Sequence, residues 1–403
     1  MLQNLDQEMQ KSGIEAIIVS GESTSNNPEF YYVTRTNIPR GGIYLKKVGQ
    51  EPLLLVNSID IPNAKKGIVK IVEPYTEYRF EEIMRKWPSD IARAIFYKKL
   101  LHANDITGKI AFYGHSEFNR LFNLVTRLQS YGYKLVAERT PTIFERIMAT
   151  KSYHEIRQIE GVGRLVQEIV NEVKHLLKDC RVRHNILFSG GKKLTVGKMK
   201  TYVRTLMSQK NLMPTEGFII ACGNKSSNPH HEGSENDIIH RKEPIIIDLF
   251  PKNMQNIFFD FTRTVVLGKG KRELYDMHKA VAEAHDLAID IAGDQVKASE
   301  LMHRVCDHLL ARGYNTVKSV YEGKSQRLTK GFIHSLGHGV GWTVGEKPFL
   351  TLTSRDVLCE GNVFTIEPGL YDKKLGGVRI EDVVAITSKG VKRLSTLEYS
   401  LEI

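Results

Sequence analysis

Four carboxylates and one imidazole in the second half of the chain have the types and spacing of a metal-binding set. They are Asp248, Asp260, His338, Glu367 and Glu381. The set is too acidic for a lone structural zinc ion, which prefers Cys and His. It suits two divalent ions that share bridging carboxylates, because the opposite charges then balance. Such a pair of ions acidifies a water molecule and polarises a carbonyl group, and amide hydrolysis requires both effects.

The two aspartates are expected at the ends of strand-like segments. Three consecutive isoleucines precede Asp248, and such a run is typical of a strand that is buried on both faces. The turn PKNMQN then lets the chain reverse, so that Asp248 and Asp260 lie side by side on neighbouring strands. Close carboxylates repel each other, and a divalent cation between them removes the repulsion. Two ordinary strand-end aspartates near a turn would produce the same local pattern.

A glycine-rich segment carries two histidines four residues apart. In HSLGHGVGW these are His334 and His338, with glycines at positions 337, 339 and 341. Glycine lets the backbone pack closely and leaves an imidazole ring open to a ligand. We therefore expect this segment to contribute to the site.

The two glutamates are associated with apolar strands. Glu367 ends a strand just before Pro368, which disfavours helix and fixes where the glutamate projects. Glu381 is expected inside the strand GGVRIEDVV, where an unpaired buried charge is costly. Arg379, two residues earlier on the same face, is the candidate partner in an ordinary ion pair.

Two domains are expected to position these residues. Residues 1–148 alternate helix and strand, which predicts an α/β domain for packing and assembly. The capping box from Ser152 to Glu155 predicts the start of a long helix that runs to about Lys178. Residues 149–403 combine such helices with several strands, including 245–248 and 260–267, and are expected to form an α+β domain that contains every candidate ligand.

The composition is that of an ordinary globular protein. Of the 403 residues, 41% are apolar and 26% are charged, and no apolar run approaches the ~18 residues of a membrane span. The N-terminus lacks the order of a signal peptide, so we expect a cytoplasmic protein. The net charge of +11 is scattered in pairs of basic residues without interleaved aromatics, which argues against a specific nucleic-acid partner. The four widely spaced cysteines argue against a zinc knuckle or a disulfide framework.

The order of these motifs resembles the pita-bread metallopeptidases, most closely Xaa-Pro dipeptidase (prolidase) and aminopeptidase P. Over about residues 150–403 the chain carries, in order, Asp, Asp-x-Thr-Arg-Thr, Gly-His-Gly-x-Gly, Ile-Glu-Pro-Gly and Arg-Ile-Glu-Asp. The resemblance implies an α+β, creatinase/aminopeptidase-like catalytic domain. An N-terminal domain of the creatinase/prolidase type would precede it, assemble the protein and edge the pocket.

The resemblance also implies a role for each matching metal ligand. Asp248 would bind one ion, Asp260 and Glu381 would bridge two ions, and His338 and Glu367 would complete the second site. The family typically uses Mn or Co, with Fe or Zn also found, and its prolidases are commonly homodimers. A hydroxide that bridges the two ions would attack the substrate.

Further residues would act on the substrate, a small peptide with proline in the second position. Glu367 would be the general base that passes a proton to the leaving nitrogen. His230 and His334 match pocket histidines of the family and are assigned both catalytic and substrate-binding roles. Arg379 is assigned to substrate binding.

The sequence departs from the family pattern in two places. The two aspartates are twelve residues apart instead of the usual eleven, which a turn can absorb. Gly345 stands where the family usually has a histidine that would hydrogen-bond the substrate carbonyl or the tetrahedral intermediate. Loss of one such donor costs roughly a hundredfold or more in rate. His231 is a candidate substitute.

Three hypotheses remain open from the sequence. The first is an exopeptidase that cleaves Xaa-Pro dipeptides, and the second is an aminopeptidase that acts on longer peptides with proline second. The third is a metal-binding interaction protein with weak or no catalysis, which Gly345 favours and the complete ligand set disfavours.

Overall fold

The chain forms two compact units, each with its own hydrophobic core, and the division falls after residue 147. The computed structural model describes residues 3–403, and these form one unit up to Ile147 and a second from Met148 to Ile403. Helix α7 (Ile143–Ala149) runs across the division. Among the described residues, no helix combines the length and the apolar character that a bilayer crossing requires.

The first unit is built around a mixed six-stranded sheet with the strand order β4-β3-β2-β1-β5-β6. The central strand β1 pairs antiparallel with β2 and parallel with β5. The strands are β1 (Ala16–Gly21), β2 (Gly42–Lys47), β3 (Leu53–Val56), β4 (Ile71–Pro74), β5 (Lys109–Tyr113) and β6 (Lys134–Leu135). The helices are α1 (Gln3–Lys11), α2 (Pro28–Thr34), α3 (Ile61–Ala64), α4 (Phe80–Lys86), α5 (Ser89–Ala103) and α6 (Phe118–Ser130).

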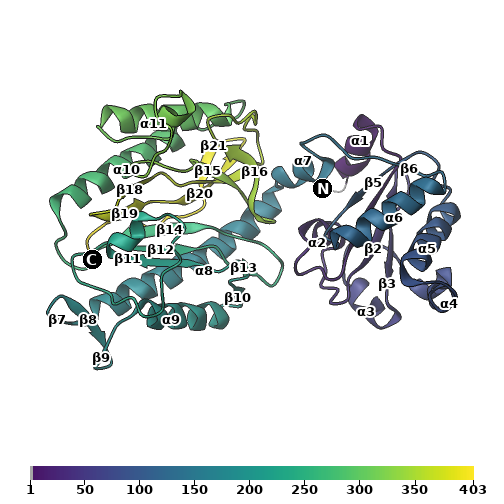
Figure 1. Cartoon of the computed structure of the whole chain (residues 1–403), viewed down its shortest axis with the longest axis horizontal. Coiled ribbons are helices and arrows are strands. Elements are labelled where there is room, and N and C mark those ends of the chain that lie inside the picture. Colours follow the sequence, from purple (N-terminus) through teal and green to yellow (C-terminus); the bar gives the residue numbers. More distant parts are fainter. Residues whose placement is uncertain (1–2) are drawn as a thin grey trace. The chain divides into compact units, whose positions relative to one another are not determined.

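Helices flank this sheet (Figure 1). On one face Ile18 of β1 and Leu45 of β2 share a core with Phe96 of α5 and Leu124 of α6. Successive strand side chains point to opposite faces, and Ile17 is therefore buried on the other side. The expected α/β alternation of this part of the chain is present.

The second unit contains two sheets that carry the candidate ligands. One has three strands in the order β11-β12-β14, and the other has five in the order β16-β15-β17-β20-β21. The principal strands are β11 (Ile219–Cys222), β12 (Ile245–Leu249), β14 (Phe261–Val265), β15 (Gly337–Val340), β16 (Val344–Leu350), β17 (Val363–Ile366), β20 (Asp382–Thr387) and β21 (Gly390–Arg393). One small three-stranded sheet and two strand pairs form from β7 (Arg181–Arg183), β8 (Ile186–Ser189) and β9 (Lys192–Lys193), from β10 (Leu212–Met213) and β13 (Lys252–Asn253), and from β18 (Gly369–Asp372) and β19 (Gly376–Arg379).

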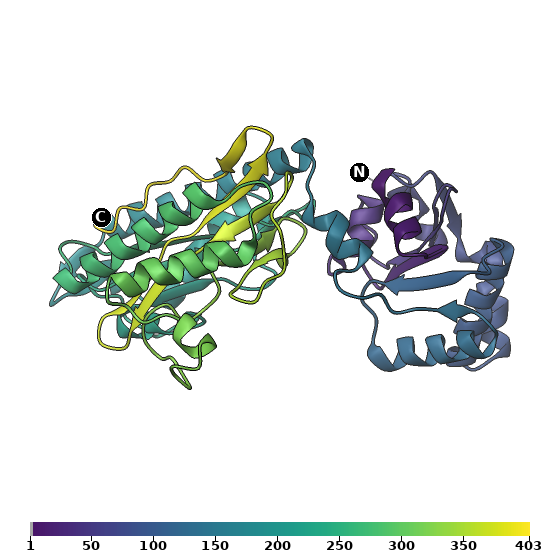
Figure 2. The same ribbon diagram turned by 90° about the horizontal axis from the view of Figure 1, so that it is seen from above.

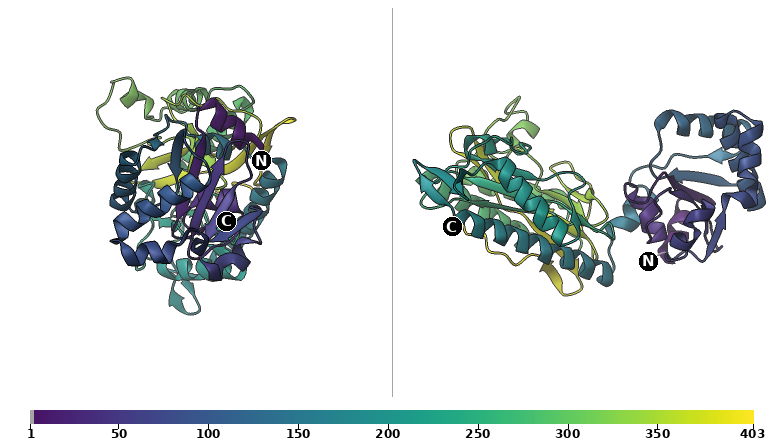
Figure 3. Two further views of the ribbon diagram at one scale, coloured as in Figure 1. Left: turned by 90° about the vertical axis from the view of Figure 1, so that its right-hand side faces the viewer. Right: turned by 90° about the horizontal axis from the view of Figure 1, so that it is seen from below.

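Helices lie on two sides of these sheets. Helices α10 (Arg272–Ile291) and α11 (Ala298–Ala311) run side by side and share a core with Phe364 of β17 and Val384 of β20 (Figure 2). Helices α8 (Tyr153–Lys178) and α9 (Val196–Gln209) lie on the other side (Figures 1 and 3), and the short α12 (Lys318–Tyr321) follows α11.

The long helix α8 begins where the sequence predicts. Ser152 accepts a hydrogen bond from the Glu155 amide, and the Glu155 side chain accepts one from the Ser152 amide, so the predicted capping box is confirmed. Gly163 lets this helix pack closely on the segment before β14, because a Cβ at that position would lie 2.4 Å from the Phe259 ring.

Two local predictions need correction. Asp260 does not lie within a strand but directly before β14, and Glu381 lies in the short break between β19 and β20 rather than inside one strand. Both carboxylates thus sit where regular pairing is interrupted, and an alternating apolar pattern does not show such an interruption.

Candidate metal centre

The three-stranded sheet supplies two aspartates. Strands β12 and β14 pair antiparallel, and Asp248 lies opposite Thr262 in the register. Asp260, two residues before Thr262, is therefore a diagonal neighbour of Asp248 on the same face. The predicted chain reversal between the two aspartates is present, and it places Asp260 directly before the strand that pairs with the strand of Asp248.

The other three candidates lie in or directly next to the three inner strands of the five-stranded sheet. His338 lies in β15, Glu367 follows β17, and Glu381 precedes β20. The glycines beside His338 permit close strand approach, since a Cβ at Gly337 would lie 2.0 Å from the Thr365 carbonyl oxygen and one at Gly339 2.1 Å from that of Lys347. Close approach is the use expected for these glycines.

The five side chains gather where the two sheets meet. Ligand atoms of Asp260, His338 and Glu381 lie within 4.8 Å of one another. His338 Nε2 is 3.6 Å from Asp260 Oδ2 and 3.5 Å from Glu367 Oε1. Asp248 lies outside the tightest group, but its charge acts on Asp260, Glu367 and Glu381.

The electrostatics of the cluster disfavour negative charge. Burial, followed by the charges of Asp248 and Glu367, raises the pKa of Asp260 well above its usual range. Burial, followed by the charge of Asp260, does the same to the pKa of Glu381. Burial also raises the pKa of Glu367, although His338 opposes the effect. A cation among these groups would stabilise their ionised forms.

The donor set fits divalent ions. Among residues 3–403, neither Asp248 Oδ1 nor Asp260 Oδ1 has a hydrogen-bond donor, although both atoms are buried. Buried carboxylate oxygens that lack a donor are costly unless something else binds them. Carboxylate oxygens and one imidazole suit borderline divalent ions such as Mn, Fe, Co and Zn.

His338 presents Nε2 to the cluster. Its Nδ1 lies 3.0 Å from the Gly339 carbonyl oxygen, which only accepts, and it can accept from the Gly345 N–H at 3.2 Å only in the tautomer without a proton on Nδ1. When Nδ1 carries the proton and donates it to Gly339, the lone pair on Nε2 is free to bind a cation.

Arg379 differs from its expected pairing. The sequence suggested Glu381 as its partner, but Arg379 Nη2 forms its ion pair with Asp248 Oδ2. The alternation of side chains along a strand predicts only which residues of that strand share a face. The observed ion pair instead joins two strands, β19 and β12. The same guanidinium donates from Nη1 to Tyr371 Oη at 2.8 Å.

Tyr371 was missed by the sequence reasoning and connects Arg379 to His334. His334 Nε2 lies 2.9 Å from Tyr371 Oη, and His334 Nδ1 lies 2.7 Å from the Ser335 carbonyl oxygen. Desolvation, followed by the charge of Arg379, lowers the pKa of His334 to about 3, so the ring is neutral near pH 7. Because a carbonyl only accepts, Nδ1 carries the proton and Nε2 accepts from Tyr371. The position of Tyr371 four residues after Glu367 was the only signal available.

The remaining sequence candidates lie at the edge of the cluster. His230 is exposed, and its charge contributes to the lowered pKa of His334. The carbonyl oxygen of the preceding residue, Pro229, accepts a hydrogen bond from Arg379 at 3.5 Å. His231 Nε2 instead lies 3.6 Å from Asp237.

Gly345 leaves a gap beside the candidate ligands. It has a φ of 84°, which favours glycine, and a Cβ built there meets no atom within 4 Å. The following Glu346 is turned away into a buried ion pair with Lys151. Among residues 3–403, therefore, no side chain occupies the space that a Cβ at Gly345 would enter, although the Gly345 amide nitrogen lies 3.2 Å from His338 Nδ1.

Comparison with known proteins gives one family. Residues 157–388 match the profile of metallopeptidase family M24. The chain is 28% identical over 400 residues to the Xaa-Pro dipeptidase of Pyrococcus horikoshii, covering 98% of this chain and 96% of that protein. It is 30% identical over 293 residues to the Xaa-Pro dipeptidase of Pyrococcus furiosus, covering 71% and 79% of the two chains.

A solved structure extends the likeness to the fold. The crystal structure of the prolidase from Pyrococcus horikoshii OT3 superposes with a TM-score of 0.75 at 25% identity and covers 99% of both chains. This confirms the architecture expected from the resemblance, an α/β first domain followed by a pita-bread domain. Because the family profile spans more than half of the sequence, the protein belongs to metallopeptidase family M24, whose members are hydrolases.

Proposed function

We propose that this protein is a metal-dependent exopeptidase that hydrolyses the Xaa-Pro bond of dipeptides. The carrying observation is the convergence of Asp260, His338 and Glu381 from two sheets, with buried carboxylate oxygens that lack donors. The substrate class is supported by the similarity to proteins named Xaa-Pro dipeptidase, one of which matches over nearly the whole chain.

Five residues would hold two divalent ions, Mn or Co in the first place, with Fe or Zn as alternatives. These residues are Asp248, Asp260, His338, Glu367 and Glu381. When bound, the ions would polarise the scissile carbonyl and acidify a water molecule. Their positive charge would compensate the negative charges of the five side chains, which burial and mutual repulsion disfavour.

Glu367 is suited to move a proton. Its side chain is 16% exposed and lies against His338, and burial raises its pKa toward the working range of a general base. We assign to it the uptake of the proton from water and its delivery to the proline nitrogen as the peptide bond breaks.

Arg379, Tyr371 and His334 form a directed chain of hydrogen bonds that holds Asp248. Arg379 donates to Asp248 and to Tyr371, and Tyr371 donates to the neutral His334. We assign Arg379 mainly to this positioning. His334 and the exposed His230 would contact the substrate by their ring faces and edges and orient it.

Gly345 supports a second candidate function. The open space at Gly345 supplies no side-chain donor to a tetrahedral intermediate, so a metal-binding protein with weak or no catalysis is the alternative. An aminopeptidase that acts on longer Xaa-Pro peptides shares the same site and differs only in substrate length. A cytoplasmic homodimer is part of the proposal.

One assay separates these candidates. The purified full chain is loaded with Mn²⁺ or Co²⁺ and given Gly-Pro, Met-Pro and the tripeptide Gly-Pro-Gly. Cleavage of the dipeptides alone supports the dipeptidase, and cleavage of the tripeptide supports the aminopeptidase. Stoichiometric metal binding without any cleavage supports the silent protein and contradicts the proposed activity.

A further inference from the structure

Glu381 depends on contacts from another strand because it lies outside the regular pairing. It occupies the break between β19 and β20, so no ladder fixes its backbone. Its N–H donates to the Thr262 carbonyl oxygen at 3.1 Å, and Thr262 Oγ1 donates to Glu381 Oε2 at 2.7 Å. Its own carbonyl oxygen accepts from Arg263 Nη1 at 2.7 Å. All three contacts come from β14, the strand that Asp260 precedes.

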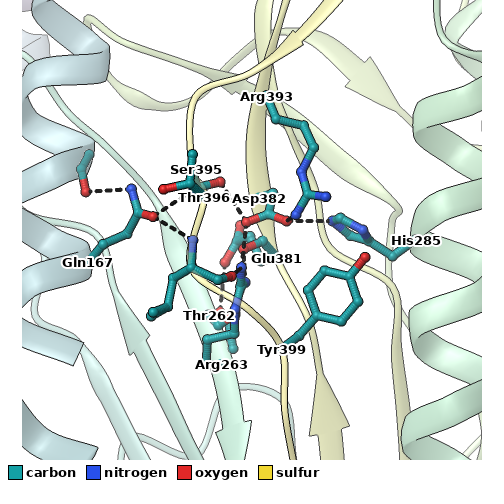
Figure 4. A network of polar contacts seen from close by, with 12 residues as sticks. Gln167, Thr262, Arg263, His285, Glu381, Asp382, Arg393, Ser395, Thr396 and Tyr399 are labelled. Atoms are coloured by element: carbon teal, nitrogen blue, oxygen red, sulfur yellow. Dashed lines mark hydrogen bonds and ion pairs between the residues drawn. The ribbon is translucent and has the colours of Figure 1, made fainter. Parts of the chain in front are cut away.

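Arg263 is the centre of this junction (Figure 4). Its side chain is 1% exposed, and its guanidinium carbon lies 4.1 Å from the centroid of the Phe261 ring. Nη1 donates to the carbonyl oxygens of Thr262 and Glu381, at 2.9 and 2.7 Å. Nη2 donates to Asp382 Oδ1 at 2.7 Å and to the Leu397 carbonyl oxygen at 2.5 Å. One group thus binds both ligand-bearing segments.

Asp382 neutralises and orients this guanidinium. It is fully buried, and Ser395 Oγ donates to its Oδ1 at 2.5 Å. Arg393 Nη2 donates to its Oδ2 at 2.6 Å, and His285 Nε2 lies 3.3 Å from the same oxygen. Figure 4 shows these side chains converging on Asp382 from separate elements. A carboxylate held on several sides cannot rotate to follow a displaced partner, so it fixes the place of Arg263.

We propose that Arg263, held by Asp382, is a positioning residue that sets the spacing of the two sheets so that Asp260 and Glu381 can share a metal ion. Asp260 directly precedes a strand of the three-stranded sheet and Glu381 directly precedes a strand of the five-stranded sheet, and among residues 3–403 these two sheets have no ladder in common. The guanidinium spans that junction. The inference rests on the proposed metal site but does not require that the site cleave Xaa-Pro peptides.

The alternative is a buried ion pair that stabilises the fold without effect on the ligands. Lysine in place of Arg263 separates the two readings, because it keeps the charge but lacks the planar set of donors that reaches two carbonyls and a carboxylate together. Loss of a group that orients a ligand typically weakens metal affinity about tenfold to a hundredfold.

A matched control is available in the same region. Gln167 Oε1 accepts from the amides of Thr396 and Leu397, at 2.7 and 2.8 Å, and so tethers the segment that Arg263 also binds. Its side-chain nitrogen donates to the Gly163 carbonyl oxygen at 3.0 Å, so the hydrogen bonds of Gln167 among residues 3–403 go to none of the five candidate ligands. Gln167→Met therefore loosens the C-terminal segment without touching Asp260 or Glu381.

The experiment titrates Co²⁺ alone into the metal-free full chain. Calorimetry gives the dissociation constant, and the visible absorption of bound Co²⁺ reports the ligand geometry. We expect Arg263→Lys to bind Co²⁺ about tenfold to a hundredfold more weakly than the wild type, with an altered absorption spectrum. Gln167→Met is expected to keep the wild-type constant and spectrum even where it lowers the unfolding temperature.

Each outcome decides the question. Wild-type affinity and spectrum in Arg263→Lys would overturn the positioning role, as would an equal loss in Gln167→Met. If Arg263→Lys does not fold, Asp382→Asn replaces it, since it keeps the guanidinium and loses only the group that orients it, and unchanged Co²⁺ binding there overturns the proposal. Failure of both variants to fold would assign Arg263 to fold stability instead. Failure of the wild type to bind Co²⁺ overturns the metal site itself, whereas binding without peptide cleavage overturns only the proposed activity.

Discussion

Replacement of Asp260 by asparagine is expected to affect stability in opposite directions with and without metal. In the metal-free protein, burial and then the charges of Asp248 and Glu367 raise the pKa of Asp260 well above its usual range. Asparagine has nearly the shape of the neutral acid and cannot ionise. The variant therefore lacks a charge that the metal-free site disfavours.

The size of the effect follows from the spacing of the ligand atoms. Those of Asp260 and Glu381 lie within 4.8 Å of each other. At an effective dielectric constant of about 20, two unit charges at that separation repel by about 3.5 kcal/mol. Proton uptake relieves part of this repulsion, so we expect metal-free Asp260→Asn to exceed the wild type by about 1–3 kcal/mol in unfolding free energy near pH 8.

The pH dependence has a fixed sign. The pKa of Asp260 is higher in the folded than in the unfolded chain, where it is about 3.9. The stability that protonated Asp260 contributes is therefore complete below the unfolded value and is lost as the pH rises through the folded value. The advantage of the variant should shrink on acidification and vanish near about pH 4.

Urea unfolding followed by circular dichroism measures these differences. With EDTA, Asp260→Asn should be the more stable protein near pH 8. With Co²⁺ at about 1,000 times its dissociation constant, the wild type should gain about 4.1 kcal/mol, more than the advantage of the variant, while the variant gains little. The order of the two proteins then reverses.

Asp372→Asn is the control of opposite sign. Asp372 pairs with Lys330 at 2.6 Å, and this bond lowers its pKa, so removal of its charge should destabilise the metal-free protein and leave the response to Co²⁺ unchanged. The reasoning is refuted if metal-free Asp260→Asn is less stable than the wild type near pH 8, or if its advantage persists unchanged near pH 4.

Three further changes test other parts of the structure. Tyr371→Phe removes the hydroxyl between Arg379 and His334 and should lower the unfolding free energy by about 1.5–3 kcal/mol in urea, since one partner is charged. Gly345→His should raise the turnover of Gly-Pro by up to about a hundredfold, with Gly345→Ala as the control for backbone strain; an equal rate in both would contradict the role given to the gap. Ser152→Ala should cost about 1 kcal/mol through loss of the helix cap, measured by thermal unfolding.

Local patterns predicted the elements and much of the candidate site. The Ser152 capping box marks the start of α8, and three isoleucines mark β12 and hence the place of Asp248. These features depend on residues near in sequence, where periodicity and capping chemistry operate. The resemblance to the metallopeptidase family likewise depended on short motifs around the candidate ligands and on their order along the chain.

Contacts between distant segments could not be predicted in the same way. The sequence paired Arg379 with Glu381, whereas its partner Asp248 is separated from it by 131 positions. The sequence did not single out Arg263. A basic residue in a buried strand is nevertheless a signal, because its charge needs a partner. Strand pairing is interrupted at Glu381, where the two sheets meet. The alternation of apolar residues along the sequence does not reveal this interruption.

The junction at Arg263 also has a consequence for the order of events during synthesis. The guanidinium binds the Leu397 carbonyl oxygen, 134 positions further along the chain. While Leu397 is still inside the ribosome, its carbonyl oxygen is not available as an acceptor for Arg263. The first unit, whose sheet lies wholly before residue 136, can fold much earlier in translation. If Arg263 positions the ligands as proposed, tight metal binding is expected only after Leu397 has left the ribosome, and a chain that stops before Leu397 is expected to bind the ion more weakly.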